Sequence, residues 1–226
     1  MIRSVGELFY PALCTGCENA LFQGEDQLCA ACILDLPYTR MHDQEGNIME
    51  QRLAGRFPFE AASSLLFFHK SGRIQHMLHA LKYQGNREIG MTLGRMLADE
   101  LKRSQRFSQI DFIIPVPMHA KKLKIRGYNQ AEVIGEGMVE KGFAMNTAAM
   151  KKVTHTTSQT RSGIYARYKN VADIFGLGNT SGLEGKKLLL MDDVLTTGAT
   201  LEACARELIK IEGVQIYIAT LACTEH

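Results

Sequence analysis

The stretch from Leu188 to Thr200 reads LLLMDDVLTTGAT, and it decides the fold. A short apolar run over residues 187–191 predicts a buried strand. Asp192, Asp193 and a turn of small residues follow directly, and an apolar stripe at helical spacing begins at Leu201. The stretch therefore predicts a strand, a turn and a helix in immediate succession.

Similar units occur elsewhere in the chain. Short apolar runs predict further strands, at 61–68, 111–116 and 214–222. Apolar residues at helical spacing predict further helices, at 74–81, 87–103 and 129–139. Residues 119–127 are expected to form a loop, and residues 151–170 a mobile loop that leads into a short helix. Alternating strands and helices indicate an α/β fold with a parallel sheet flanked by helices.

The composition is that of a folded protein. The chain has 226 residues, of which 46% are hydrophobic and 22% charged, enough for one full domain and a small appendage. The formal net charge of +2 is too small to indicate a polyanionic partner by itself. No apolar run approaches the roughly 18 residues needed to cross a bilayer, and residues 1–13 lack a secretory signal. We therefore expect a cytoplasmic protein that is not inserted in a membrane.

Two CxxC pairs, separated by 11 residues, mark the N-terminal part of the chain: Cys14, Cys17, Cys29 and Cys32. This layout is typical of a tetrahedral zinc site. A head too small to have its own core would fold around the metal, which indicates structural Zn²⁺. Disulfides or a redox CxxC are the alternative. We expect a zinc-binding head at 1–36, a linker at 37–56 and the main domain at 57–226.

The turn between the predicted strand and helix is suited to an anion. Backbone N–H groups and the positive end of a helix hold phosphate in such turns. The candidate phosphate-binding residues are Thr196, Thr197, Gly198, Ala199 and Thr200. The chain has neither the P-loop pattern nor the dinucleotide-binding glycine pattern, so other phosphate loops fit poorly.

The two acids before the turn would repel a phosphate unless the ligand separates the charges. A ribose 5-phosphate does so, because its 2- and 3-hydroxyls can donate to Asp192 and Asp193 while the phosphate lies in the turn. The same hydroxyls can help bind the Mg²⁺ that a pyrophosphate leaving group needs. An acid pair that merely caps the turn and the helix is the simpler alternative.

Leu188–Thr200 resembles the signature of type I phosphoribosyltransferases that binds 5-phosphoribosyl-1-pyrophosphate (PRPP). Further motifs resemble the ComF family of competence-associated proteins, including its GntX-like members. They are Pro115–Pro117, Arg126–Gln130, Gln159 with Arg161, Arg167 and Asn170, and the four-cysteine head. The resemblance implies a five-stranded parallel core, PRPP bound with Mg²⁺, and a role in DNA uptake or transformation in some bacteria.

The resemblance also gives roles to basic residues. Lys121, Lys122 and Arg126 follow a strand end, where ligands of open α/β sheets gather, and would face the pyrophosphate. Arg161 and Arg167 lie in a segment that resembles the mobile loop closing over substrate, where they could bind phosphate oxygens. A solvated basic loop and ordinary surface arginines are the alternatives. The catalytic candidates are Asp192, Asp193 and Arg126.

Two functions remain open from the sequence. The first is a phosphoribosyltransferase, a glycosyltransferase of the pentosyltransferase class, that moves the 5-phosphoribosyl group of PRPP to a nitrogenous acceptor and releases pyrophosphate. The second is a non-catalytic sensor of PRPP or a nucleotide that engages single-stranded DNA or a DNA-uptake helicase. Against the second, Tyr128 is the only aromatic residue beside the basic loop, whereas single-strand platforms interleave aromatic and basic residues.

Overall fold

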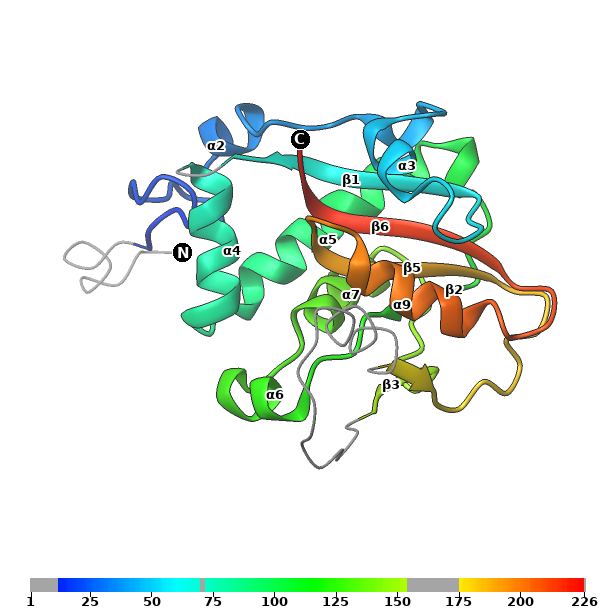
Figure 1. The fold of residues 1–226 in the computed structure, drawn as a ribbon. Coiled ribbons are helices and arrows are strands. Elements are labelled where there is room, and N and C mark those ends of the chain that lie inside the picture. The colour runs from blue at the N-terminus through cyan, green and yellow to red at the C-terminus, as the bar shows by residue number, and fades with distance from the viewer. Residues whose placement is uncertain (1–11, 70–71, 154–174, 226) are drawn as a thin grey trace, which may run out of the picture.

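The centre of the fold is a parallel sheet of four strands. The computed structural model describes residues 12–69, 72–153 and 175–225 (Figure 1). The strand order is β1-β6-β5-β2, and every neighbouring pair is parallel. The strands are β1 (Ala61–Phe68), β2 (Phe112–Pro115), β5 (Lys187–Leu195) and β6 (Gln215–Thr224). All four predicted strands are thus confirmed, although β5 runs past the apolar segment and carries both acids of the motif.

The implied fifth strand is reduced to a single bridge in the described residues. Beside β2, Ile113 forms an isolated parallel bridge with Met145. The Ile113 amide donates to the Ala144 carbonyl at 2.8 Å, and the Asn146 amide donates to the Ile113 carbonyl at 2.9 Å. The expectation of a five-stranded core is therefore wrong for the part of the chain described, because this edge segment pairs over too short a length to form a strand.

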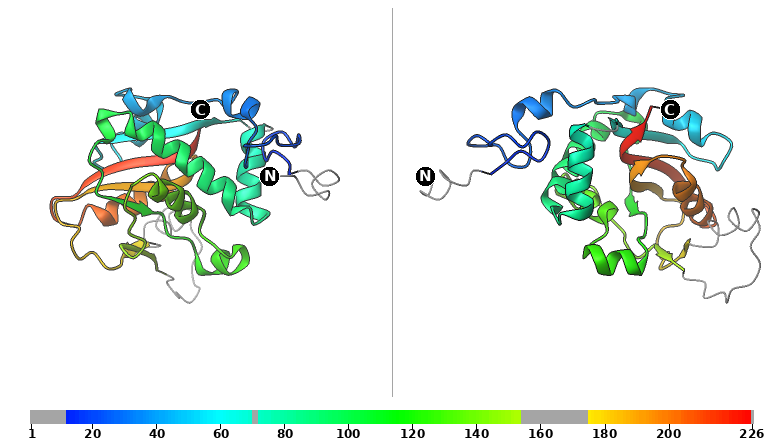
Figure 2. Two further views of the ribbon diagram at one scale, coloured as in Figure 1. Left: turned by 180° about the vertical axis from the view of Figure 1, so that it is seen from behind. Right: turned by 60° about the vertical axis from the view of Figure 1, so that its left-hand side comes forward.

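Helices cover both faces of the sheet (Figures 1 and 2). One core lies under α4 (Arg73–Tyr83), α5 (Arg87–Lys102) and α7 (Gln130–Glu140), and the other lies under α3 (Ile48–Leu53) and α9 (Ala199–Leu208). Successive residues of β5 alternate between the two cores, as the two-residue period of a strand requires: Leu189 and Met191 in the first, Leu188 and Leu190 in the second.

Glycines allow α5 and α7 to touch. A Cβ at Gly94 would lie 2.1 Å from the Ile134 carbonyl oxygen, and one at Gly137 would lie 2.1 Å from the Met91 carbonyl oxygen. The low helix propensity of glycine is therefore outweighed here by close packing of the two helices.

The loop predicted at 119–127 is wrong, because these residues include the helix α6 (Ala120–Arg126). The His119 side chain caps it by accepting from the Lys121 amide at 3.1 Å, and Gly127 ends it in the left-handed region at φ 81°. None of its residues is buried, so it shows no apolar stripe in the sequence. Short β3 (Met150–Lys152) and β4 (Phe175–Leu177) form an antiparallel pair that was not predicted. The rest of the loop predicted at 151–170 lies outside the described residues.

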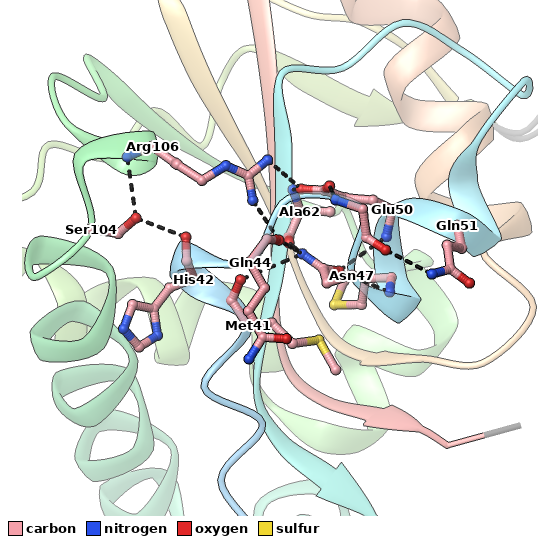
Figure 3. Close-up of polar contacts among 11 residues, drawn as sticks. Met41, His42, Gln44, Asn47, Glu50, Gln51, Ala62, Ser104 and Arg106 are labelled. Carbon is pink, nitrogen blue, oxygen red and sulfur yellow. Dashed lines mark hydrogen bonds and ion pairs between the residues drawn. The ribbon is translucent and has the colours of Figure 1, made fainter.

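The predicted linker is folded against the main sheet. It contains the 3₁₀ helix η1 (Met41–Asp43) and α3, whose Met49 and Leu53 are fully buried. Figure 3 shows its polar contacts. The Arg106 guanidinium lies 2.7 Å from a carboxylate oxygen of Glu50, and the side-chain nitrogen of Asn47 donates to the Ala62 carbonyl at 2.8 Å. The division of the chain into head, linker and main domain stays a prediction.

The cysteine head lies beside α4 at one end of the molecule (Figures 1 and 2). It contains α2 (Ala30–Leu34). The side-chain nitrogen of Asn86 joins it to the main domain by donating to the side-chain oxygen of Gln27 at 3.0 Å. Among the described residues, none of the helices combines the length and the apolar character needed to cross a bilayer.

Candidate functional site

The strand–turn–helix of the motif forms as predicted at the carboxyl end of β5. The turn leads into α9 through Gly198, which caps the helix at φ 78°. A Cβ at this position would lie 2.9 Å from the Leu53 side chain, so both the backbone angle and the space favour glycine. A small cavity of about 30 Å³ is lined by Asp192 and by residues 194–201, which include all five candidate phosphate-binding residues.

A larger cavity of about 370 Å³ joins the acids to basic residues from other elements. Its charged and hydroxyl-bearing lining includes Lys82, Lys122, Arg126, Lys152, Asp192, Asp193 and Thr200. Five of the predicted site residues therefore meet here: the two acids, Arg126, Lys122 and Thr200. Lys121 is exposed and does not line this cavity, while Arg161 and Arg167 lie outside the described residues.

Lys82 is a site residue that the sequence analysis missed. Its ammonium nitrogen lies 2.7 Å from a carboxylate oxygen of Asp193, and both side chains are mostly shielded, at 23% and 17% exposed. Lys82 sits in the last turn of α4, and its position in the sequence gives no sign that this helix ends over the carboxyl end of β5.

The surroundings of the acid pair make Asp192 hold its proton more tightly than an ordinary aspartic acid, which raises its pKa. Burial, and then the neighbouring Asp193 carboxylate, raise the pKa of Asp192 to about 7. The Asp193 amide, which donates to Asp192 at 2.8 Å, and the cations of Lys82 and Lys152 act in the opposite direction. Burial, and then Lys122, lower the pKa of Lys152. A bound cation, or hydroxyl donors of a ligand, would favour the ionised form of Asp192.

Arg126 is held in place by Gln130 of the same motif and by Tyr83 of α4. Its guanidinium donates to Gln130 at 2.8 Å and lies 5.1 Å from the centre of the Tyr83 ring. Gln130 is 2% exposed, and its side-chain nitrogen has no hydrogen-bond partner among the described residues, although the residue lines the larger cavity. Because an unpaired buried donor is unfavourable, this nitrogen is an unsatisfied group in the wall of the cavity.

Arg56 is a second residue that the sequence analysis missed. It follows α3 in the predicted linker and donates to the Thr197 carbonyl in the phosphate-type turn. The same guanidinium lies 3.8 Å from Glu202, and the Arg56 carbonyl accepts from Arg206 at 2.8 Å. Arg56 therefore ties the turn to α3 and α9, a contact between segments that are far apart in the sequence.

The four head cysteines come together as predicted. Their sulfur atoms all lie within 4.8 Å of one another, with 3.8 Å between those of Cys17 and Cys29. A tetrahedron with metal–sulfur bonds of about 2.3 Å has edges of about 3.8 Å. All six cysteines are free in this structure, with none of them joined by a disulfide. The cluster could therefore hold a metal.

Backbone groups favour a thiolate at Cys14 in this cluster, whereas the pKa values of Cys29 and Cys32 are raised. Burial raises the pKa of Cys14, but amides of Cys29, Cys17 and Gly16 outweigh it, and the pKa falls to about 6. The amide of Cys29 donates to the Cys14 sulfur at 3.3 Å. Burial raises the pKa of Cys32. A bound metal would favour the thiolate form of all four.

The fold and the site define a phosphoribosyltransferase-type protein, and the chain belongs to the phosphoribosyl transferase domain family, whose model matches residues 90–226. Among curated proteins, it is 26% identical over 212 residues to competence protein F of Haemophilus influenzae, covering 91% of this chain and 88% of that protein. It is 24% identical over 238 residues to DNA utilization protein YhgH of Escherichia coli O157:H7, covering 96% and 99%. The ComF resemblance and the expected fold class are confirmed.

Two solved structures are similar at low identity. One is the glutamine PRPP amidotransferase of B. subtilis complexed with ADP and GMP, at a TM-score of 0.41 and 13% identity, covering 63% of this chain and 30% of that chain. The other is a hypoxanthine phosphoribosyltransferase of Staphylococcus aureus, at a TM-score of 0.35 and 15% identity, covering 59% and 62%.

Proposed function

We propose that this protein binds PRPP with Mg²⁺ and transfers the 5-phosphoribosyl group to a nitrogenous acceptor, with release of pyrophosphate. The observation that carries the proposal is the continuity of the site. An acid pair at the end of β5 runs directly into a phosphate-type turn at the start of α9, and lysine and arginine side chains line the same cavity. The match to the phosphoribosyl transferase domain family and the small cavity lined by the turn also support PRPP as the ligand.

In this proposal the 5-phosphate lies in the turn formed by residues 196–200, where the amino end of α9 favours an anion. The ribose hydroxyls donate to Asp192 and Asp193, which places C1 of the ribose in the larger cavity.

The pyrophosphate occupies the basic side of the larger cavity. Arg126 and Lys122 line it and stabilise the negative charge that develops as the bond from C1 to the pyrophosphate oxygen breaks. The carboxylates of Asp192 and Asp193 are the hard oxygen ligands that suit Mg²⁺. When bound, Mg²⁺ supplies further positive charge to the leaving group. Lys121, Arg161 and Arg167 remain proposed phosphate contacts.

The metal of the head is proposed to be structural Zn²⁺ at Cys14, Cys17, Cys29 and Cys32. Four sulfur ligands leave no open coordination position for substrate, which is typical of structural rather than catalytic zinc. We also propose a cytoplasmic location and the division of the chain at residues 36 and 56.

Pyrophosphate release from PRPP, measured with a panel of nitrogenous bases, tests the transfer reaction. We expect release that depends on the base and falls at least 100-fold in the variant with both Asp192→Asn and Asp193→Asn. Asp99→Asn on α5, whose carboxylate pairs with Lys141 at 2.9 Å, is the matched control and should leave the rate unchanged. PRPP binding without release for any base would contradict transfer and favour a sensor.

The sensor is a second candidate function, linked to DNA uptake by the names of the relatives. One observation favours it: Tyr83, 67% exposed, gives the basic region around Arg126 an exposed aromatic ring, whereas Tyr128 is buried. Binding of single-stranded oligonucleotides that weakens steeply with salt would support it. Absence of such binding at low salt would count against DNA as a direct partner.

A further inference from the structure

A second cavity of about 450 Å³ adjoins the first. The two share Lys82, Tyr83, Lys122 and Arg126, whereas Gly85 and Ile125 line only the second. Its volume falls within the range of about 300–1,000 Å³ that is usual for small-molecule sites. Lys82, which lines both cavities, contacts Asp193, so the second cavity is one side chain away from the acid pair.

Two exposed apolar side chains line this second cavity. Tyr83 is 67% exposed and Ile125 is 84% exposed. The Tyr83 ring is held from its own helix by the His79 ring, with 5.0 Å between the ring centres, and from α6 by the Arg126 guanidinium. A fixed, exposed aromatic ring and an exposed isoleucine in the lining of one cavity suit a flat apolar ring of a ligand.

The charge of the second cavity is positive. Its described lining has three cationic side chains and no carboxylate. Lys82 is paired with Asp193, but the hydrogen bond of Arg126 goes to the neutral amide of Gln130. The cavity therefore favours an anionic ligand, and a carboxylate is the group that an arginine fork and a lysine bind well.

We propose that the second cavity is the acceptor subsite and that the acceptor is a planar heteroaromatic acid. This inference rests on the proposed function of the first cavity. The ring lies against Tyr83 and Ile125, its carboxylate faces Lys122 and Arg126, and a ring nitrogen faces C1 of the ribose. The two basic residues line both cavities, so their charges serve the acceptor and the pyrophosphate together.

The transfer step is balanced in this arrangement. The ring nitrogen supplies the electron pair of the new bond to C1, and the bond from C1 to the pyrophosphate oxygen breaks with its electron pair on pyrophosphate. A proton, where the nitrogen carries one, passes to water.

Tyr83→Trp gives a direct test, because the chain contains no other tryptophan. We would titrate this variant with orotate and nicotinate, and with uracil and nicotinamide as uncharged counterparts, with and without PRPP and Mg²⁺. Free N-acetyltryptophanamide corrects for absorption by the ligands. We expect at least one acid to change the tryptophan emission, with a Kd at least tenfold below that of its counterpart. No response to either acid, or an equal response to the counterparts, would overturn the proposal.

A pair of variants on α6 tests the location. Ile125→Glu puts a negative charge into the second cavity, while Leu123→Glu puts the same charge on the same helix at a residue that lines neither cavity. We expect Ile125→Glu to weaken acid binding at least tenfold relative to Leu123→Glu, and to weaken PRPP binding by a smaller factor, since PRPP is also held by the acids and the turn. Equal acid binding in the two variants would overturn the assigned location.

The same titrations separate failure of this inference from failure of the proposed function. PRPP binding without any response to the acids overturns the acceptor subsite and leaves the proposed function intact. A response to the acids without PRPP binding overturns the proposed function and the acceptor role, and keeps only the class of ligand. Tighter binding of oligothymidylate than of either acid would assign the surface to single-stranded DNA instead and overturn the proposal.

Discussion

The ammonium of Lys82 lies 2.7 Å from the carboxylate of Asp193, so the last turn of α4 supplies a cation to the acid pair on β5. This contact joins the helix that packs beside the cysteine head to the strand that carries the proposed sugar-binding acids. It also sets a competition, since Lys82 and a divalent cation would both be attracted to Asp193.

Removing this cation should therefore strengthen Mg²⁺ binding. At the effective dielectric constant of a protein surface, a unit charge a few ångströms away is worth about 1–4 kcal/mol before screening. We expect Lys82→Met to raise the affinity for Mg²⁺ alone about three- to tenfold in calorimetry at pH 8.5, where Asp192 is ionised; near pH 7 the gain is offset because loss of Lys82 raises the pKa of Asp192 further. Lys141→Met, which breaks the 2.9 Å pair with Asp99, is the matched control and should have no effect. Weaker Mg²⁺ binding in Lys82→Met would show that the lysine does not compete.

The raised pKa of Asp192, about 7, predicts a pH dependence of ligand binding. Mg²⁺ needs the ionised carboxylate, so its affinity should rise as pH increases through 7 and then level off. Calorimetry between pH 5.5 and 8.5 measures this, and Asp192→Asn should flatten the profile. A profile for the wild type that is flat across pH 7 would contradict the prediction.

The same pKa predicts an effect on stability. The unfolded Asp192 loses its proton near 3.8 and the folded one near 7, so between these values the folded state holds the extra proton. The contribution to the free energy of unfolding therefore falls as pH rises from about 4 to 7. Asp192→Asn should raise the unfolding free energy at pH 8 by on the order of 1–3 kcal/mol relative to the wild type, and have little effect near pH 4. Denaturant unfolding at the two pH values measures the difference, and an effect of equal size at both would contradict it.

Gly198→Ala should disturb the phosphate-type turn. It forces alanine to φ 78° and brings its Cβ to 2.9 Å from Leu53. Gly182→Ala is a matched control, since Gly182 has φ 77° and no neighbour within 4 Å. Both variants should lose about 1–2 kcal/mol of unfolding free energy from the backbone angle. Only Gly198→Ala should lose PRPP affinity, at least tenfold by calorimetry, and an equal loss in Gly182→Ala would contradict the role of the turn.

The cysteine head should contain one Zn²⁺ per chain, measured by elemental analysis of the purified protein. Cys14→Ser should lose the metal, because zinc sites of this kind need all four thiolates. Cys223→Ala, a buried thiol of β6 outside the cluster, should keep it. A folded head without metal in the wild type would contradict the zinc site.

The strands could be predicted because burial on both faces leaves a continuous apolar run, and the larger helices because burial on one face leaves an apolar stripe at helical spacing. Leu188 to Met191 alternate between two cores, and the stripes of α4 and α5 face one of them. The helix α6 could not be found this way, since none of its residues is buried. Its capping residues, His119 and Gly127, were the remaining signal.

The acids and the turn could be predicted because they are neighbours in the sequence. Lys82 and Arg56 could not, since each reaches the site through a tertiary contact with a distant segment. The sequence indicates Gly198 only as a candidate phosphate-binding residue, yet the Leu53 side chain beside it also requires a glycine there. Residues that are neighbours in the sequence could thus be predicted together, whereas contacts between distant segments could be found only from the fold.

Calorimetry of PRPP, with and without Mg²⁺, is the most direct measurement of the proposed division of roles between acids and turn. The wild type should bind PRPP in the presence of Mg²⁺. The variant with both Asp192→Asn and Asp193→Asn should bind at least 100-fold more weakly, and Asp99→Asn should bind as the wild type does. If the double variant binds PRPP as tightly as the wild type, the acids do not hold the sugar, and the proposed ligand geometry is wrong.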